Sequence, residues 1–106
     1  MNVKVEPDHS EVDEGVVKAR VSGEIDPSTA PALLAELEAL IFTGAPRELV
    51  VDFAGVSFID SSGLRSVIDI HNQMRARGGV LVLENPSEKT RRLLEITGLT
   101  DHLELR

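Results

Sequence analysis

At 106 residues the chain has room for one hydrophobic core, so we predict a single domain over residues 1–106 and exclude a second, catalytic domain. Its net charge of −7 argues against direct binding to nucleic acid or to an anionic lipid surface. Because the sequence contains no cysteine, disulfides, cysteine nucleophiles and thiolate metal sites are also excluded.

The first part of the chain predicts two strands and a helix. Residues 1–7 alternate and are charged, which predicts a short edge strand that Pro7 ends, followed by a polar loop. They contain no apolar run that resembles a signal peptide or a membrane-spanning helix, so we expect a cytoplasmic protein without membrane insertion. Residues 16–22 alternate apolar and polar side chains, which predicts a half-exposed strand that pairs with the first as a hairpin. A helix is expected over residues 27–42, with Asp26 as its cap and a proline in the first helical position.

The central part predicts a strand followed by a long helix. Residues 49–53 are apolar on both faces apart from Asp52, which is typical of a buried strand with that carboxylate near its exposed end. From Leu64 onward apolar residues recur at helical spacing. Gly78 and Gly79 end this helix, because glycine accepts the left-handed conformation without a steric cost.

The last part adds two strands and a helix. The continuous apolar run 80–83 predicts a second buried strand. Ser87 is placed to cap a helix that extends to about Ile96, with Ile96 and the leucines before it facing inward. Leu103 and Leu105 predict a short last strand or an extended tail. This order predicts an α/β fold, a mixed β-sheet of four to five strands packed against about three helices.

Asp60, Ser61 and Ser62 lie where the central strand meets the long helix. Their side-chain oxygens are of the kind that accept hydrogen bonds from the free amides of a first helical turn. The positive end of the helix dipole favours negative charge here, so a phosphoryl group on Ser61 can be carried without disrupting the helix. A simple capping role for Ser61 fits the local pattern as well.

Two separated motifs resemble those of a known family. Residues 59–64, Ile-Asp-Ser-Ser-Gly-Leu, and residues 23–26, Gly-Glu-Ile-Asp, are similar to the bacterial anti-sigma factor antagonists built on the STAS domain. The Gly98-Leu99 pair and Leu103 fit the family's C-terminal pattern, so the resemblance covers essentially the whole chain.

The resemblance implies a regulator that acts by binding, with Ser61 as its phosphoacceptor. Unphosphorylated, it would engage an anti-sigma factor that is also a serine kinase, and so free a sigma factor. Phosphorylation of Ser61 by that partner would release it, and a metal-dependent serine phosphatase would reset it. The chain itself is expected to need no cofactor, since ATP and magnesium would belong to the kinase. The alternative is a non-switching STAS subunit of a transporter or a signalling scaffold.

A surface around the acceptor is expected to contact the partner. Polar side chains follow the acceptor at three- and four-residue spacing, which predicts a rim on the solvent side of the helix, although a merely solvated polar face fits the same spacing. This rim consists of Ser62, Arg65, Ser66 and Asp69. By the resemblance Asp26 joins the surface, and Arg65 departs from the family at a position where some members carry a small residue. The full set of expected partner-binding residues is Asp26, Asp60, Ser61, Ser62, Gly63, Arg65, Ser66 and Asp69.

The sequence gives little support to catalysis by Ser61. No glycine lies two residues before either serine, so the Gly-x-Ser-x-Gly elbow of hydrolases is missing. The three histidines, His9, His71 and His102, are scattered, which disfavours both a catalytic triad and a metal site. His71 falls on the apolar side of the long helix and is interpreted as a histidine at the edge of the core. We therefore predict no catalytic residues, no bound metal and no enzyme activity.

Overall fold

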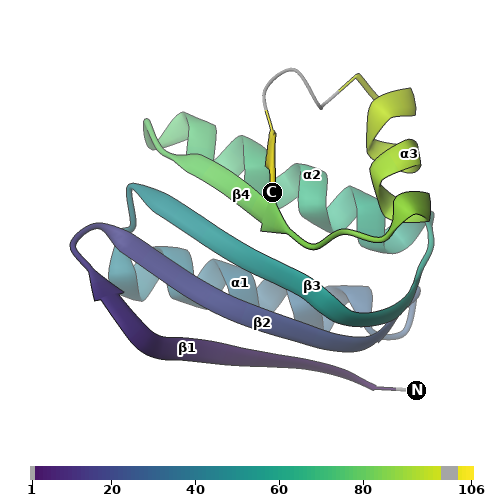
Figure 1. Cartoon of the computed structure of the whole chain (residues 1–106), viewed down its shortest axis with the longest axis horizontal. Coiled ribbons are helices and arrows are strands. Elements are labelled where there is room, and N and C mark those ends of the chain that lie inside the picture. The colour runs from purple at the N-terminus through teal and green to yellow at the C-terminus, as the bar shows by residue number, and fades with distance from the viewer. Residues whose placement is uncertain (1, 99–102) are drawn as a thin grey trace.

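The fold is a five-stranded sheet with three helices in the residues described by the computed structural model, which are 2–98 and 103–106, with the backbone alone at 9–13 (Figure 1). Strands and helices follow the predicted order. In chain order they are β1 (Val3–Asp13), β2 (Val16–Ile25), α1 (Ala30–Gly44), β3 (Glu48–Ile59), α2 (Ser61–Ala76), β4 (Val80–Glu84), α3 (Glu88–Ile96) and β5 (Glu104–Leu105).

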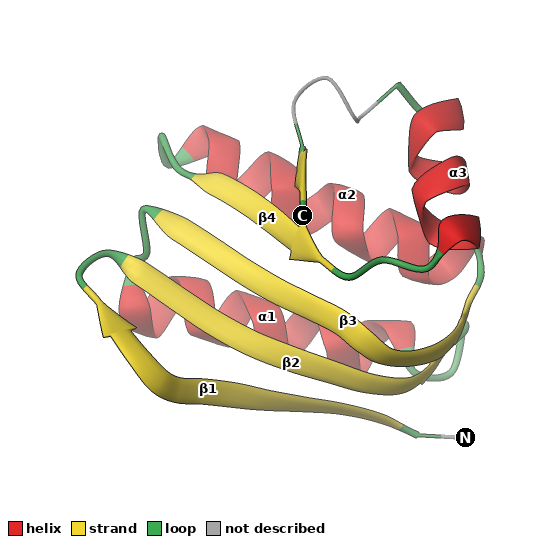
Figure 2. Cartoon of the chain, in the orientation of Figure 1, coloured by secondary structure: helices red, strands yellow, loops and turns green. Residues whose placement is uncertain are grey.

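The sheet is mixed, as predicted, and its strands lie in the order in which they occur along the chain. β1 and β2 form an antiparallel hairpin, whereas β2, β3, β4 and β5 pair in parallel. Figure 2 shows α1 and α2 side by side behind the sheet, with α3 at the edge of the molecule, after the loop that follows β4. The hydrophobic core fills the layer between the sheet and the two long helices, and includes Leu33, Ile41, Leu49, Ile70 and Leu81.

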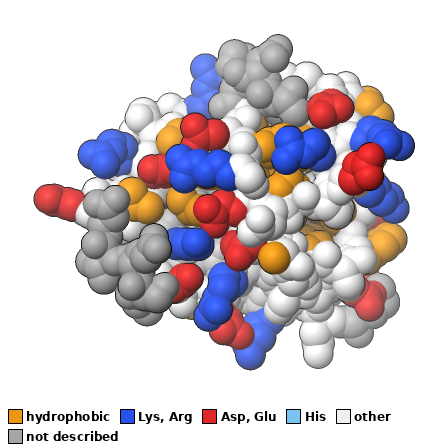
Figure 3. Space-filling model, viewed as in Figure 1, with side chains coloured by type: hydrophobic (Ala, Val, Ile, Leu, Met, Phe, Trp, Pro, Cys, Tyr) orange, Lys and Arg blue, Asp and Glu red, His pale blue; other side chains and the backbone are white. Residues whose placement is uncertain are grey.

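The other face of the sheet carries charged side chains. Lys18 alternates along β2 with the buried Ala19, so it points away from the helices. Its ammonium group lies 3.1 Å from the Glu84 carboxylate of β4, and Arg106 pairs with Glu48 at 3.0 Å. Figure 3 shows basic and acidic side chains interspersed over this face. A face of mixed charge is suited to solvent.

Three strand predictions are wrong at their ends. β1 runs on to Asp13, although Pro7 and a loop were expected to end it; because β1 is an edge strand, the missing amide of Pro7 is tolerated there. β2 extends three residues beyond the predicted 16–22. β3 continues to Ile59, far past the predicted 49–53, because it pairs with β2 through two register shifts.

The longer β3 also corrects the position of Asp52. This residue lies within β3 rather than at its end, but its pairing with Glu84 is the last between β3 and β4. The Asp52 carboxylate accepts hydrogen bonds from the amide of Ala54 (2.8 Å) and from the side chain of Asn85 (3.0 Å). The Asp52 carboxylate therefore has two hydrogen-bond donors at the point where the pairing with β4 ends.

The predictions for the second half are mostly confirmed. α2 occupies the predicted place, Gly78 follows it with φ +75°, and the run 80–83 lies within β4. Ser87 caps α3 by accepting from the amide of Thr90 at 3.1 Å. Ile96 was expected to face inward and instead is 76% exposed, while Leu94 is fully buried. Of the C-terminal motif, Leu99 lies outside the described residues.

Candidate functional site

The two sequence motifs meet because β2 and β3 are parallel neighbours. Ile25 at the end of β2 pairs with Ile59 at the end of β3. Just beyond, the amide of Asp60 donates to the carbonyl of Ile25 at 3.2 Å. The turn that leads into α1 and the turn that leads into α2 therefore lie side by side at one end of the sheet.

Asp60 is the N-cap of α2. Its backbone is extended, and its Oδ1 accepts hydrogen bonds from the amides of Ser62 (2.9 Å) and Gly63 (3.3 Å). Ser61 is the first residue of the helix, so the simple capping role considered for it is wrong. Within the described part of the chain the exposed Ser61 hydroxyl has no recorded hydrogen bond. Because the Asp60 carboxylate accepts the hydrogen bonds of the first-turn amides, the Ser61 hydroxyl is not needed for capping.

Asp26 closes the turn before α1 instead of capping the helix. The cap position is Thr29, and α1 begins at Ala30 rather than at residue 27. Asp26 is 7% exposed, and its Oδ1 accepts from the Ser28 amide (2.8 Å), the Ser28 hydroxyl (2.6 Å) and the Thr29 amide (3.1 Å). The Ser28 hydroxyl is the main reason that the pKa of Asp26 lies below its usual value; burial acts in the opposite direction. A charged, buried carboxylate thus orders residues 26–29.

Gly63 and Ser66 lie on the buried side of α2. A Cβ on Gly63 would come 2.5 Å from Ile25 Cγ2 and 2.7 Å from Ile59 Cγ1, so only glycine lets the helix start this close to the strand ends. Ser66 was expected on the solvent side but is 5% exposed. Its hydroxyl donates to the carbonyls of Ala30 (3.4 Å) and Ser62 (3.3 Å) because it faces α1.

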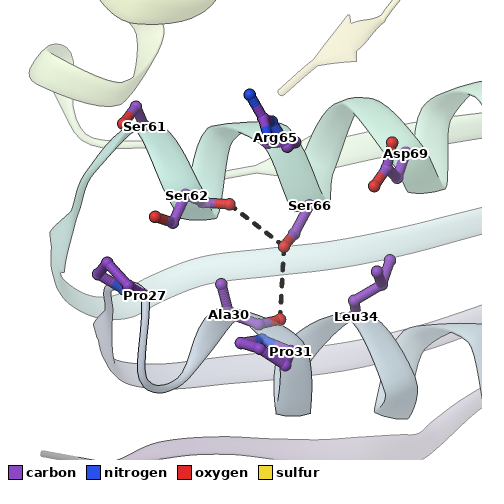
Figure 4. A pocket seen from close by; sticks show the side chains of 9 residues that line it. All are labelled: Pro27, Ala30, Pro31, Leu34, Ser61, Ser62, Arg65, Ser66 and Asp69. Atoms are coloured by element: carbon purple, nitrogen blue, oxygen red, sulfur yellow. Dashed lines mark hydrogen bonds between the residues drawn. The ribbon is translucent and has the colours of Figure 1, made fainter.

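A groove of about 430 Å³ runs between the start of α1 and the first turns of α2. Figure 4 shows Ser62, Ser66 and Asp69 along its α2 side and apolar side chains on the α1 side. The apolar side, which consists of Pro27, Ala30, Pro31 and Leu34, was not predicted, because the pattern within one segment does not show which residues of another helix lie across from it. The groove is lined by Pro27, Ala30, Pro31, Leu34, Ser61, Ser62, Arg65, Ser66 and Asp69.

The expected partner-binding residues differ in how accessible they are. Ser61, Ser62, Arg65 and Asp69 line the groove with at least part of their side chains accessible. Ser66 also lines the groove but is buried. Gly63 and Asp26 are buried and do not line it, and Asp60 holds the helix end that presents Ser61. Whether each contacts a partner stays a prediction.

The histidines lie away from Ser61 wherever the structure describes them. His71 is 2% exposed, deeper in the core than the edge position expected from the sequence. It lies ten positions along α2, which is roughly 15 Å of helix. The side chain of His9 and all of His102 lie outside the described residues. Among the described residues no cluster of His, Asp or Glu could hold a metal ion.

Comparisons with known proteins agree with this geometry. The family model described as STAS domain matches residues 9–106. An anti-sigma-B factor antagonist from Bacillus subtilis is 36% identical over 99% of this chain and 92% of its own length. The Bacillus protein SpoIIAA in its phosphorylated form superimposes with a TM-score of 0.75 at 27% identity, over 97% of this chain and 91% of that one.

A more distant likeness concerns the fold alone. The murine anion transporter Slc26a9 matches 94% of this chain and 19% of its own, with a TM-score of 0.70 and 15% identity. In the described part of this chain, no helix is both long enough and apolar enough to cross a membrane.

Proposed function

The chain belongs to the STAS domain family, among the anti-sigma factor antagonists, and from this we propose that it is a partner-switching regulator controlled by phosphorylation of Ser61. Unphosphorylated, it binds an anti-sigma factor that is also a serine kinase and thereby frees a sigma factor. The same partner phosphorylates Ser61, which weakens the complex. A metal-dependent serine phosphatase then restores the active form.

The observation that carries this proposal is the position of the Ser61 hydroxyl. Ser61 is exposed at the first position of α2, beside a groove that contains both apolar and polar side chains. Because Asp60 already caps the helix, a change at Ser61 leaves the hydrogen bonds of the first turn in place. The switch therefore acts on the surface and needs no refolding.

The chemistry proposed is phosphoryl transfer from ATP held by the kinase. A bond forms between Ser61 Oγ and the γ-phosphorus while the bond from that phosphorus to the bridging oxygen breaks, which releases ADP. The hydroxyl proton passes to a base of the kinase. In the reset step water attacks the phosphorus, returning the serine hydroxyl and inorganic phosphate.

The effect on binding follows from charge. Phosphorylation adds about 1.5 to 2 negative charges at neutral pH to a surface that already carries Asp60 and Asp69. A partner surface that fits the neutral serine must then remove water from a dianion, which costs binding free energy. A decrease of only about 1.4 kcal/mol in the binding free energy lowers the affinity tenfold.

The first test is phosphate mapping. The purified chain is incubated with ATP, magnesium and extract from its own organism, and the added mass is located by peptide sequencing. We expect one phosphate on Ser61, absent from Ser61→Ala and retained in the neighbouring control Ser62→Ala. No phosphate, or phosphate confined to other serines such as Ser87, would overturn the switch.

That negative result would favour the alternative of a fixed subunit in a transporter or scaffold. At present the likeness to an anion transporter concerns the fold alone, and no described contact favours this alternative.

A further inference from the structure

Arg65 lies one helical turn after the phosphoacceptor, with no ion pair recorded in the described residues. Both side chains are exposed and line the same groove. Figure 4 shows Ser61 and Arg65 on the side of α2 turned away from α1, with Ser66 on the opposite side. Residues four apart on a helix have Cβ atoms about 5–6 Å apart, within reach of a long guanidinium. The Arg65 guanidinium is therefore placed to pair with a negatively charged group on Ser61.

The order of the two residues suits such a pair. An acidic group at the first helical position interacts favourably with the positive end of the helix dipole. An anion four residues before a cation is also the more stabilising order, whereas Asp69 follows Arg65 in the less favourable order. Arginine can meet a phosphate with two parallel N–H donors.

The same arrangement already exists elsewhere in the molecule. Glu88 is the first residue of α3, and Arg92 follows four residues later. The Glu88 carboxylate and the Arg92 guanidinium form an ion pair of 3.3 Å. Ser61 and Arg65 occupy the corresponding positions of α2, so a phosphate on Ser61 would place a negative group where α3 has its glutamate.

We propose that Arg65 is the internal counter-ion of a phosphate on Ser61, so that phosphorylation both adds negative charge and withdraws this cation from the partner. Among the described residues that line the groove, Arg65 is the only basic one. In the unphosphorylated chain it is therefore available to an acidic side chain of the anti-sigma factor. This inference rests on the proposed function and specifies the chemistry of its switch.

Other charged groups near the acceptor are few among the described residues. The α1 side of the groove, formed by Pro27, Ala30, Pro31 and Leu34, carries no charge. Asp60 holds the amides of the first turn. On α3, the ammonium group of Lys89 lies 5.4 Å from the ring of Phe58, three residues before Ser61. Lys89 is therefore the competing cation that the test must separate from Arg65.

The test uses the full chain with phosphoserine at position 61. The phosphoserine is inserted during expression with an expanded genetic code, so no kinase is needed. The second ionisation of the phosphate is followed by ³¹P NMR as the pH is varied. We expect Arg65→Gln to raise the midpoint by about 0.15 to 0.4 pH unit, because a nearby cation stabilises the dianion. Arg65→Lys should raise it less, and Lys89→Gln should leave it unchanged.

A midpoint that does not move in Arg65→Gln, or that moves only in Lys89→Gln, would overturn the pairing. A merely structural role of Arg65 would leave this titration unchanged. The outcome is separate from the phosphate mapping above: absence of phosphate in the extract refutes the switch, whereas an unchanged titration refutes only the role of Arg65.

Discussion

The amide of Asp60 donates to the carbonyl of Ile25 at 3.2 Å, which joins the ends of two parallel strands whose motifs are more than thirty residues apart. This bond holds the turn closed by Asp26 next to the turn capped by Asp60. The groove between α1 and α2, with Ser61 at its edge, is a consequence of that arrangement.

A charge at Ser61 is expected to weaken binding to the anti-sigma factor of the same organism. We predict that Ser61→Asp binds at least about tenfold more weakly than wild type, since a surface fitted to a neutral serine then meets a carboxylate, whereas Ser61→Ala stays close to wild type. Isothermal titration measures both. Ser87→Asp is the matched control, because it adds the same charge at the start of another helix, where Ser87 is the cap and aspartate is also a good cap. Equal affinities for Ser61→Asp and wild type would contradict the prediction.

Loss of the Asp60 cap is expected to destabilise the protein. Asp60→Ala leaves the amides of Ser62 and Gly63 without their acceptor, and we predict a decrease of about 1 kcal/mol in the free energy of unfolding. Urea denaturation measures it. Asp60→Asn retains a side-chain oxygen and should lose less, so equal losses for the two variants would show that the cap is not the cause.

Gly63→Ala is expected to destabilise the protein, although alanine favours helices by about 1 kcal/mol over glycine. The new methyl group would overlap Ile25 Cγ2 and Ile59 Cγ1, and overpacking of this kind costs about 1–3 kcal/mol. Ser62→Ala, one position earlier and partly exposed, should change stability little. A more stable Gly63→Ala variant, by thermal or urea unfolding, would show that α2 shifts freely on the sheet.

Asp26 predicts a pH dependence of stability. Because its pKa is lowered on folding, its stabilising contribution is complete above the unfolded value of about 3.9 and is lost as the pH falls through the lower folded value. The difference in unfolding free energy between wild type and Asp26→Asn should therefore be constant near neutral pH and shrink below about pH 4. Urea denaturation at several pH values measures this difference. A difference that stays constant down to pH 2.5 would contradict the lowered pKa.

Features fixed by local chemistry were predictable from the sequence. Asp60 before a serine pair, an apolar stripe and Gly78 define α2 within a single stretch of chain, because caps, helical periodicity and left-handed glycine depend on neighbouring residues only. The run 80–83 and Ser87 defined β4 and the start of α3 in the same way. The order of the elements, and with it the α/β class, followed from these local signals.

Other features depended on contacts between distant residues. Pro7 lies inside β1, and β3 extends to Ile59, because each strand is held by pairing with β2, a partner that periodicity within one segment does not reveal. Ser66 is buried, although its spacing from Ser62 predicted exposure, because α1 packs across that side of α2. The sequence by itself determined the helix end that presents Ser61; the tertiary structure alone decided which side chains share its surface, since burial depends on what packs against each face.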